Sequence, residues 1–189
     1  MNTRLFLGLG IAVCLAMASC KKDEPEDPII PNEEELITTL TYTLEPSNGG
    51  TNIVLNFQDL DGDGGDAPLI SVSGPLTSGE TYIGQLTLLD ETSTPVGDIS
   101  EEVEEEAEEH QFFFVVDAVD VTVSYSDSDN DGNPVGLSSQ LVAGAASTGT
   151  LQITLRHEPD KDAAGVSDGL ITNAGGETDI EVSFEVEVQ

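Results

Sequence analysis

The sequence predicts an all-β protein, an antiparallel immunoglobulin-like β-sandwich with one short acidic helix or loop. Apolar and polar residues alternate with a period of two in several segments, which is typical of strands with one face on a core and one in water. The clearest case is DIEVSFEVEV (179–188), where every second residue is apolar. Turn signals rich in Gly, Asn, Ser and Pro separate these segments, and the number of short strands favours a sandwich.

Eight further segments are predicted to be strands. QFFFVV (111–116) is continuously apolar and therefore predicts a central strand that is buried on both faces. The other seven are rich in Thr, Val, Ile, Leu and Tyr, and they span 36–45, 51–58, 68–73, 81–90, 120–126, 137–143 and 149–157.

One segment departs from the strand pattern. DISEEVEEEAEEH (98–110) places Ile99, Val103 and Ala107 on one helical stripe, and Asp98 followed by Glu101 fits a capping box. Its glutamates also repel one another at i,i+4 spacing, by about 0.2–0.5 kcal/mol per pair. A short helix on the sandwich and an irregular acidic loop are both consistent with these features.

The N-terminal part is predicted to lie outside the fold. Residues 1–19 carry Arg4 and a short apolar run, which is typical of a signal peptide. The small residues directly before Cys20 resemble the lipobox of bacterial lipoproteins, so Cys20 would carry the lipid. Residues 20–35 are charged and Pro-rich and predict a tether, which leaves a single domain over 36–189. Lys-Lys-Asp-Glu after Cys20 is similar to the export signal of Bacteroidota surface lipoproteins, which implies an outer-membrane anchor facing the cell exterior.

The charge balance excludes some partners. The formal net charge is −32, and Arg156 and Lys161 are the only basic residues after position 30. The domain therefore has almost nothing with which to neutralise phosphates, which excludes nucleic acid. Cys14 would leave with the signal peptide and Cys20 would be lipidated, so no disulfide is expected.

Strand parity predicts which loops lie together. If consecutive strands run antiparallel, every second one ends at the same end of the sandwich. Both Asp-rich loops, the Glu run and both histidines would then share one end. The opposite end would hold Gly49, Gly50, Gly79 and the Gly175–Gly176 turn.

Two loops repeat the pattern Asp-x-Asp-x-Asp-Gly, which is the first half of a calcium-binding loop. Alternate carboxylates on a tightly curled backbone converge on one hard cation, and Gly permits the sharp turn. Neither loop has the glutamate at position twelve that an EF-hand requires, so another segment would complete the site. Solvated acidic β-turns remain the alternative. The predicted ligands are Asp59, Asp61, Asp63, Gly65 and Asp66 in loop one, and Asp127, Asp129, Asp131 and Asn133 in loop two.

The two histidines suggest a second metal site. His110 and His157 each adjoin a glutamate, Glu109 and Glu158, and the parity argument places both pairs at one end. Imidazole nitrogens with a carboxylate would bind zinc or copper, and two histidines could ligate haem iron. Separate surface histidines are the simpler alternative.

No catalytic motif is present. The sequence lacks Gly-x-Ser-x-Gly, His-Glu-x-x-His and a phosphate loop, and the predicted mature chain has no free thiol. Carboxylate pairs suit glycoside hydrolysis, but the chain has no Trp on which a sugar would stack. We therefore expect a binding protein and not an enzyme.

Several motifs carry a wider resemblance. These are LDGDGG (60–65), EEHQFF (108–113), LRHEP (155–159), GVSDG (165–169) and ITNAGGETDIEVSFEV (171–186). With these the chain resembles a family of uncharacterised Bacteroidota lipoproteins often encoded beside TonB-dependent outer-membrane receptors. The resemblance implies an accessory binding protein for ligand uptake with calcium-stabilised loops. The alternatives are transition-metal or haem binding through His110 and His157, and a calcium-dependent structural or adhesive surface domain.

Overall fold

The computed structural model describes residues 35–62 and 65–189, which belong to one compact unit. The predicted signal peptide, Cys20 and nearly all of the predicted tether lie outside the described residues. Within the described part of the chain, no helix is both long and apolar enough to cross a membrane.

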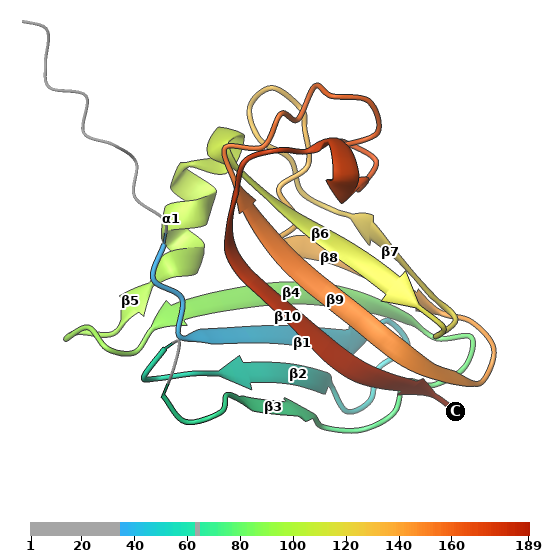
Figure 1. Cartoon of the computed structure of the whole chain (residues 1–189). Helices are drawn as coiled ribbons and strands as arrows, with labels where there is room; N and C mark the ends of the chain where they lie inside the picture. Colours follow the sequence, from blue (N-terminus) through green and yellow to red (C-terminus); the bar gives the residue numbers. More distant parts are fainter. Residues whose placement is uncertain (1–34, 63–64) are drawn as a thin grey trace, which may run out of the picture. The chain divides into compact units, whose positions relative to one another are not determined.

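The larger of two antiparallel sheets contains seven strands in the order β3-β2-β1-β4-β8-β7, with the short β5 paired to β4 (Figure 1). Six of these strands were predicted from the sequence, and only the two-residue β5 was not expected. The bounds are Thr39–Pro46 for β1, Ile53–Gln58 for β2, Leu69–Val72 for β3, Thr81–Asp90 for β4, Gly97–Asp98 for β5, Val121–Tyr125 for β7 and Ser138–Ala143 for β8.

The smaller sheet has the order β10-β9-β6 and lies across the larger one (Figure 1). Its strands span Glu177–Val188 (β10), Ser147–His157 (β9) and His110–Asp117 (β6). Alternate apolar residues from both sheets are buried in one hydrophobic cluster, in which Leu40 and Leu55 meet Ile153 and Phe184. The all-β antiparallel prediction is confirmed, while the immunoglobulin-like strand order stays a prediction.

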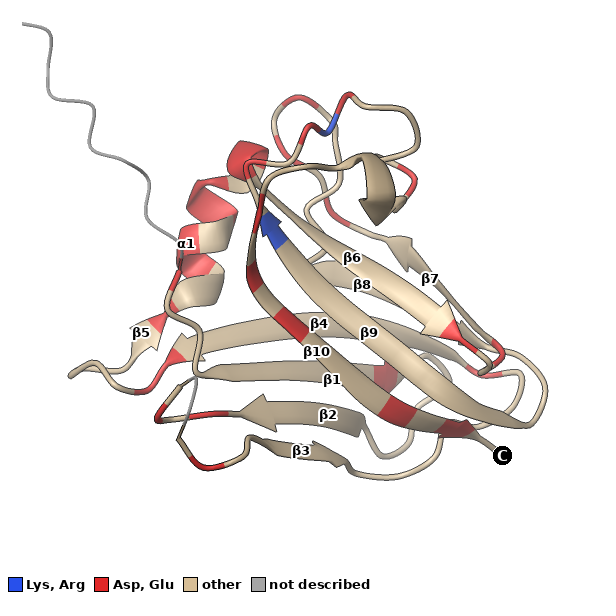
Figure 2. Cartoon of the chain, viewed as in Figure 1, with Lys and Arg blue, Asp and Glu red and all other residues tan. Residues whose placement is uncertain are grey.

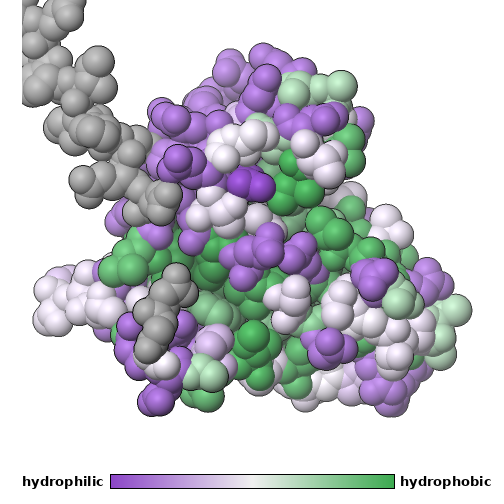
Figure 3. Space-filling model, in the orientation of Figure 1, coloured by the Kyte–Doolittle hydropathy of each residue, from purple (hydrophilic) through white to green (hydrophobic). Residues whose placement is uncertain are grey.

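The acidic segment forms a helix, as one of the two alternatives predicted. The helix α1 spans Ile99–Glu105 and is followed by a 3₁₀ turn, Ala107–Glu109. The Asp98 side chain accepts a hydrogen bond from the Ser100 amide, which caps the helix. Ile99 and Val103 are buried against the core, while the glutamates face water (Figure 2). The same region is strongly hydrophilic on the molecular surface (Figure 3).

One predicted position is wrong. QFFFVV was expected in a central strand, but β6 is an edge strand of the smaller sheet. Its two faces are nevertheless both covered at its start, because Phe112 packs in the main core and Phe113 packs with Val166 and Ala174. The long connection between β9 and β10 supplies those two residues, so a loop covers the face that a second layer would otherwise cover.

The grouping of the acidic loops and histidines at one end is confirmed. Glu108 of the acidic run accepts a hydrogen bond from Asn130 of loop two, and loop one lines a pocket with Asp179 beside the histidines. The missed strand β5 did not disturb the parity, because β5 and α1 both stay near the end of β4. The Gly175–Gly176 turn was misplaced, since a Cβ on Gly176 would lie 2.2 Å from the His157 carbonyl oxygen.

Gly84 in β4 is a site where a side chain cannot fit. The Tyr42 and Ser139 hydroxyls form a buried 2.8 Å hydrogen bond across β4, and a Cβ on Gly84 would lie 2.4 Å from the Tyr42 hydroxyl. We expect Gly84→Ala to lower the free energy of unfolding by about 1–3 kcal/mol through overpacking. Urea denaturation measures this change. The control is Gly74→Ala, whose Cβ would meet only Ile53 at 3.8 Å. Equal stability of the two variants would contradict the steric explanation.

Candidate metal centre

The two histidines are cross-strand neighbours. His110 is the first residue of β6, His157 is the last of β9, and the two pair directly in the sheet register. Both lie on the face that carries Phe112 and Leu155, so their side chains are directed toward the interior between the sheets. The ring centroids are 4.8 Å apart at an interplanar angle of 63°.

Asp179 reaches the histidines because β10 is irregular. Strict alternation would place Asp179 on the outer face with Glu181, but the register between β10 and β9 shifts between Thr178 and Ile180. Such a β-bulge leaves one residue outside the ladder and re-aims its side chain. The Asp179 side chain is fully buried beside His110 and His157.

Glu35 comes from the other side of the sandwich. It precedes β1 of the larger sheet, and its side chain is only 6% exposed. Its two oxygens lie 3.3 Å from His110 Nε2 and 3.4 Å from His157 Nδ1, while Asp179 oxygens lie 3.9 and 3.7 Å from the same atoms. Each carboxylate therefore spans both imidazoles. The inner cluster consists of Glu35, His110, His157 and Asp179.

The dimensions of the inner cluster match those of a metal site. One ligand atom from each residue lies within 4.8 Å of all the others. A tetrahedral ion with ligands at about 2.0–2.2 Å has ligand–ligand separations of about 3.3–3.6 Å. The nitrogen-to-oxygen distances of 3.3–3.9 Å, each taken to the oxygen that lies nearer that imidazole, are close to this range, while one atom from each residue requires the wider limit of 4.8 Å. They are longer than the ~2.7–2.9 Å of a charge-assisted hydrogen bond. The group could hold a metal ion.

The orientation of His110 is fixed by a hydrogen bond on the side of the ring away from the carboxylates. Its Nδ1 lies 3.1 Å from the Glu106 carbonyl oxygen, which can only accept a hydrogen bond, so Nδ1 carries the proton and donates. In the neutral ring, this tautomer leaves Nε2, which faces the carboxylates, with its lone pair available. Histidine ligands of metals are held in this way by a second hydrogen bond. This carbonyl belongs to the residue that caps the end of α1, directly before the 3₁₀ turn.

In the absence of an ion, opposite charges compensate one another. Burial by itself would raise the pKa of Glu35, but the nearby imidazole of His110 outweighs burial and lowers this pKa. Burial would likewise lower the pKa of His110, yet the Glu35 carboxylate, aided by Asp179, raises it above its ordinary value. The metal-free cluster therefore favours an ionised Glu35 beside a protonated His110.

The sequence identified half of the inner cluster. His110 and His157 are brought together as predicted, whereas Glu109 and Glu158 lie outside it and form a separate exposed group with His157. Glu35 was assigned to the tether, because nothing in NEEEL distinguishes the third glutamate. Asp179 was not singled out in its alternating strand, because alternation does not reveal a bulge.

Loop one lies next to the inner cluster. Asp59, Asp61, Glu35 and Asp179 all line one pocket of about 610 Å³. The Asp59 carboxylate accepts hydrogen bonds from the Asp61 and Gly62 amides, and Asp61 accepts one from Asp66. Gly65 packs directly under the Asp61 carboxylate. Asp63 lies outside the described residues, and calcium binding here stays a prediction.

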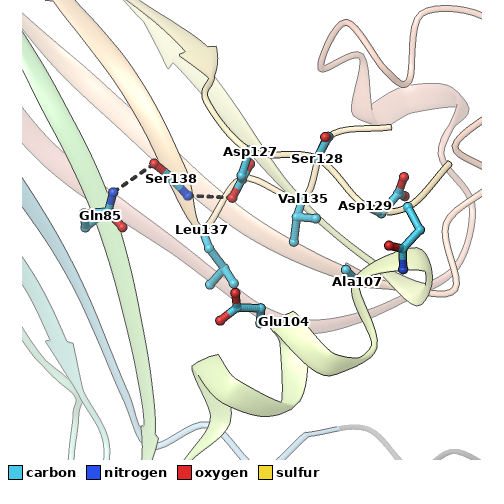
Figure 4. A pocket seen from close by; sticks show the side chains of 10 residues that line it. Gln85, Glu104, Ala107, Asp127, Ser128, Asp129, Val135, Leu137 and Ser138 are labelled. Carbon is cyan, nitrogen blue, oxygen red and sulfur yellow. Dashed lines mark hydrogen bonds between the residues drawn. The ribbon is translucent and has the colours of Figure 1, made fainter. Parts of the chain in front are cut away.

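Two carboxylates of loop two, those of Asp127 and Asp129, already have donors. Asp127 accepts hydrogen bonds from the Gly136 amide and from the Ser138 amide, the second of which is drawn in Figure 4. Asp129 accepts hydrogen bonds from the Asp131 and Asn133 amides. The carbonyl of Asn133, a predicted calcium ligand, accepts a hydrogen bond from the Asp129 amide. The loop borders a pocket of about 340 Å³.

A buried lysine supplies the positive charge in loop two. Lys161 Nζ lies 2.9 Å from Asp129 Oδ2 and also donates to the carbonyls of Ala107 and Pro134. Burial opposes ionisation of Asp129, but the hydrogen bond from Lys161 and those from the backbone lower its pKa. This ammonium compensates the carboxylate that was predicted to bind calcium, and the calcium prediction for loop two remains untested.

Comparisons with protein-family models, with curated proteins and with solved structures found no match.

Removal of the lysine charge should be costly. We expect Lys161→Met to lower the free energy of unfolding by about 3 kcal/mol, because Asp129 is left buried without its counter-charge. The double variant with Asp129→Asn should recover part of this loss. Chemical denaturation of both variants measures the effect, and a single variant as stable as wild type would show that the pair contributes nothing.

Proposed function

We propose that this domain binds a divalent transition metal, with zinc as the best fit. The observation that carries the proposal is the inner cluster, in which two imidazoles and two carboxylates converge in a buried space. Two neutral imidazoles and two carboxylates would balance the charge of a divalent cation. Binding would release the proton held on His110 in the metal-free state.

The ligand types distinguish zinc from its competitors. Calcium takes six to eight oxygen ligands, whereas the inner cluster offers two nitrogens. Copper also accepts imidazole, but in its divalent state it prefers a square-planar or tetragonal arrangement. Haem would need open space beside each imidazole, and Glu35 and Asp179 lie there. A four-ligand nitrogen and oxygen set in a closed site supports zinc.

The complete set of four protein ligands supports metal binding and not catalysis. Catalytic zinc sites keep one coordination position for water or substrate, while structural sites take four protein ligands. The inner cluster supplies four protein ligands with side chains no more than 6% exposed. An ion held there would join Glu35, ahead of the larger sheet, to three strands of the smaller sheet.

The cellular setting of this function is proposed from the sequence. We propose that the protein is anchored by lipid at Cys20 to the outer membrane, with the domain at the cell exterior. An accessory role beside a TonB-dependent receptor would then place a metal-binding domain at the site of ligand uptake. A calcium-dependent structural or adhesive domain remains the rival proposal, and loop one is its remaining support.

Zinc should stabilise the domain. At one hundred times the dissociation constant, a bound ion adds about 2.7 kcal/mol, which raises the midpoint of thermal unfolding by roughly 5–10 °C for a chain of this size. The measurement compares chelator-treated protein with and without zinc. The gain should disappear in Asp179→Asn and in His110→Gln, with zinc affinity weakened by about two orders of magnitude. Glu185→Gln, an exposed acid on the same strand, is the control. Unchanged affinity in both ligand variants would rule out the inner cluster.

Calcium should act separately from zinc. Under the proposal for loop one, millimolar calcium raises the unfolding midpoint of zinc-saturated protein, and Asp61→Asn abolishes that rise. Magnesium serves as the control ion. A midpoint that does not respond to calcium would leave loop one as a solvated turn. Calcium-dependent self-association, measured by sedimentation, would favour the adhesive rival.

A further inference from the structure

A second group of potential ligands adjoins the inner cluster. Glu109, His157 and Glu158 offer ligand atoms that also lie within 4.8 Å of one another. These residues form the outer cluster. Both glutamates are exposed, while His157 is buried and belongs to the inner cluster as well. The two clusters therefore share one imidazole.

The backbone explains why the outer cluster lies at this place. Glu109 directly precedes His110 and Glu158 directly follows His157, so the two glutamates stand one step beyond the cross-strand histidine pair. The Glu158 amide donates a 2.6 Å hydrogen bond to the Glu109 carbonyl, which continues the pairing past the end of the sheet. Glu158 has φ of +49°, a left-handed conformation that is unfavourable for a residue with a side chain. This turn breaks the strand alternation at Glu158.

The buried position of the inner cluster creates a problem of access. Its side chains are at most 6% exposed, and a zinc ion in water carries a hydration shell that must be removed before it enters. Exposed carboxylates can replace water ligands one at a time. An imidazole has two nitrogens, and His157 Nδ1 is the one that faces Glu35 and Asp179.

We propose that the outer cluster is the entry site for the metal, from which zinc passes to the inner cluster with His157 as the shared ligand. The proposal rests on zinc binding at the inner cluster. The ion is captured by Glu109 and Glu158 at the surface, exchanges water for the His157 imidazole, and moves inward as Glu35 and Asp179 replace the surface carboxylates. The final site contains no ligand from Glu109 or Glu158.

The pocket lined by loop one is the competing route. It also reaches Glu35 and Asp179, and it carries Asp59 and Asp61 at its wall. The outer cluster is favoured because it alone combines exposed carboxylates with a nitrogen ligand of the final site. An ion arriving there already meets one residue of the final site.

Loading kinetics test the proposal. Zinc association and dissociation are measured by stopped flow on the chelator-stripped full chain at fixed salt. In Glu109→Gln/Glu158→Gln we expect the association rate to fall about tenfold. The dissociation rate should fall by a similar factor, since the same path is used outward, and the dissociation constant should stay within about threefold of wild type.

Two controls remove the same number of charges elsewhere. Glu101→Gln/Glu105→Gln alters exposed acids of α1, and Asp59→Asn/Asp61→Asn alters the competing pocket. Both should load zinc at close to the wild-type rate. A comparable slowing in the α1 variant would mean that general charge attraction accounts for the effect and would overturn the proposal. Slowing confined to the loop-one variant would assign entry to the pocket instead.

The remaining outcomes separate the two proposals. A tenfold weaker affinity with an unchanged dissociation rate in the outer-cluster variant would show that its carboxylates only attract the ion, which overturns the entry site. Unchanged kinetics in that variant, with binding still dependent on Asp179, would overturn the entry site and leave the inner cluster intact. Absence of zinc binding in the wild type would remove both.

Discussion

The pairing of His110 with His157 is the constraint on which the rest of the site depends. Both rings are directed into the interior at the end of the smaller sheet, where an unpaired polar group is costly. Two carboxylates, one brought by a bulge in β10 and one from the segment before β1, lie against the rings. The fold thus concentrates four ionisable groups in one buried space, which is stable only if opposite charges or a cation balance them.

The same end of the domain shows two ways to stabilise buried carboxylates. In loop two, Asp129 is balanced by the ammonium of Lys161 and by backbone amides, so all its partners belong to the chain. In the inner cluster, the His110 imidazole lowers the pKa of Glu35, and the Glu35 carboxylate raises the pKa of His110 in turn. A lysine holds its charge far above neutral pH, whereas an imidazole can give up its proton near neutral pH. Under the proposed function, only the second arrangement would exchange its proton for a metal ion.

The sequence-based predictions differed in reliability according to the range of the interactions they depended on. Alternation in 81–90 and 179–188 reflects local burial, and both strands formed as expected. The edge position of β6 depends on which strands pair, and a continuous apolar run does not reveal that. For the site, strand parity predicted that the histidines lie at the same end of the sandwich, but it did not predict their distance or orientation. The positions of Glu35 and Asp179 depend on the path of the chain before β1 and on a bulge in β10, and neither has a local sequence signature.

The sequence by itself determined the all-β class, the approximate positions of the main strands, the acidic character and the shared location of the acidic loops and histidines. These follow from periodicity and charge, which are properties of neighbouring residues. Only the tertiary structure decided which acids join the histidines and which are occupied elsewhere. In so acidic a chain, nearly any acid could have been a neighbour of the histidines. Asp179 and Glu35 are the neighbours because strand register and the path of the chain into β1 place their oxygens within 4 Å of the imidazoles.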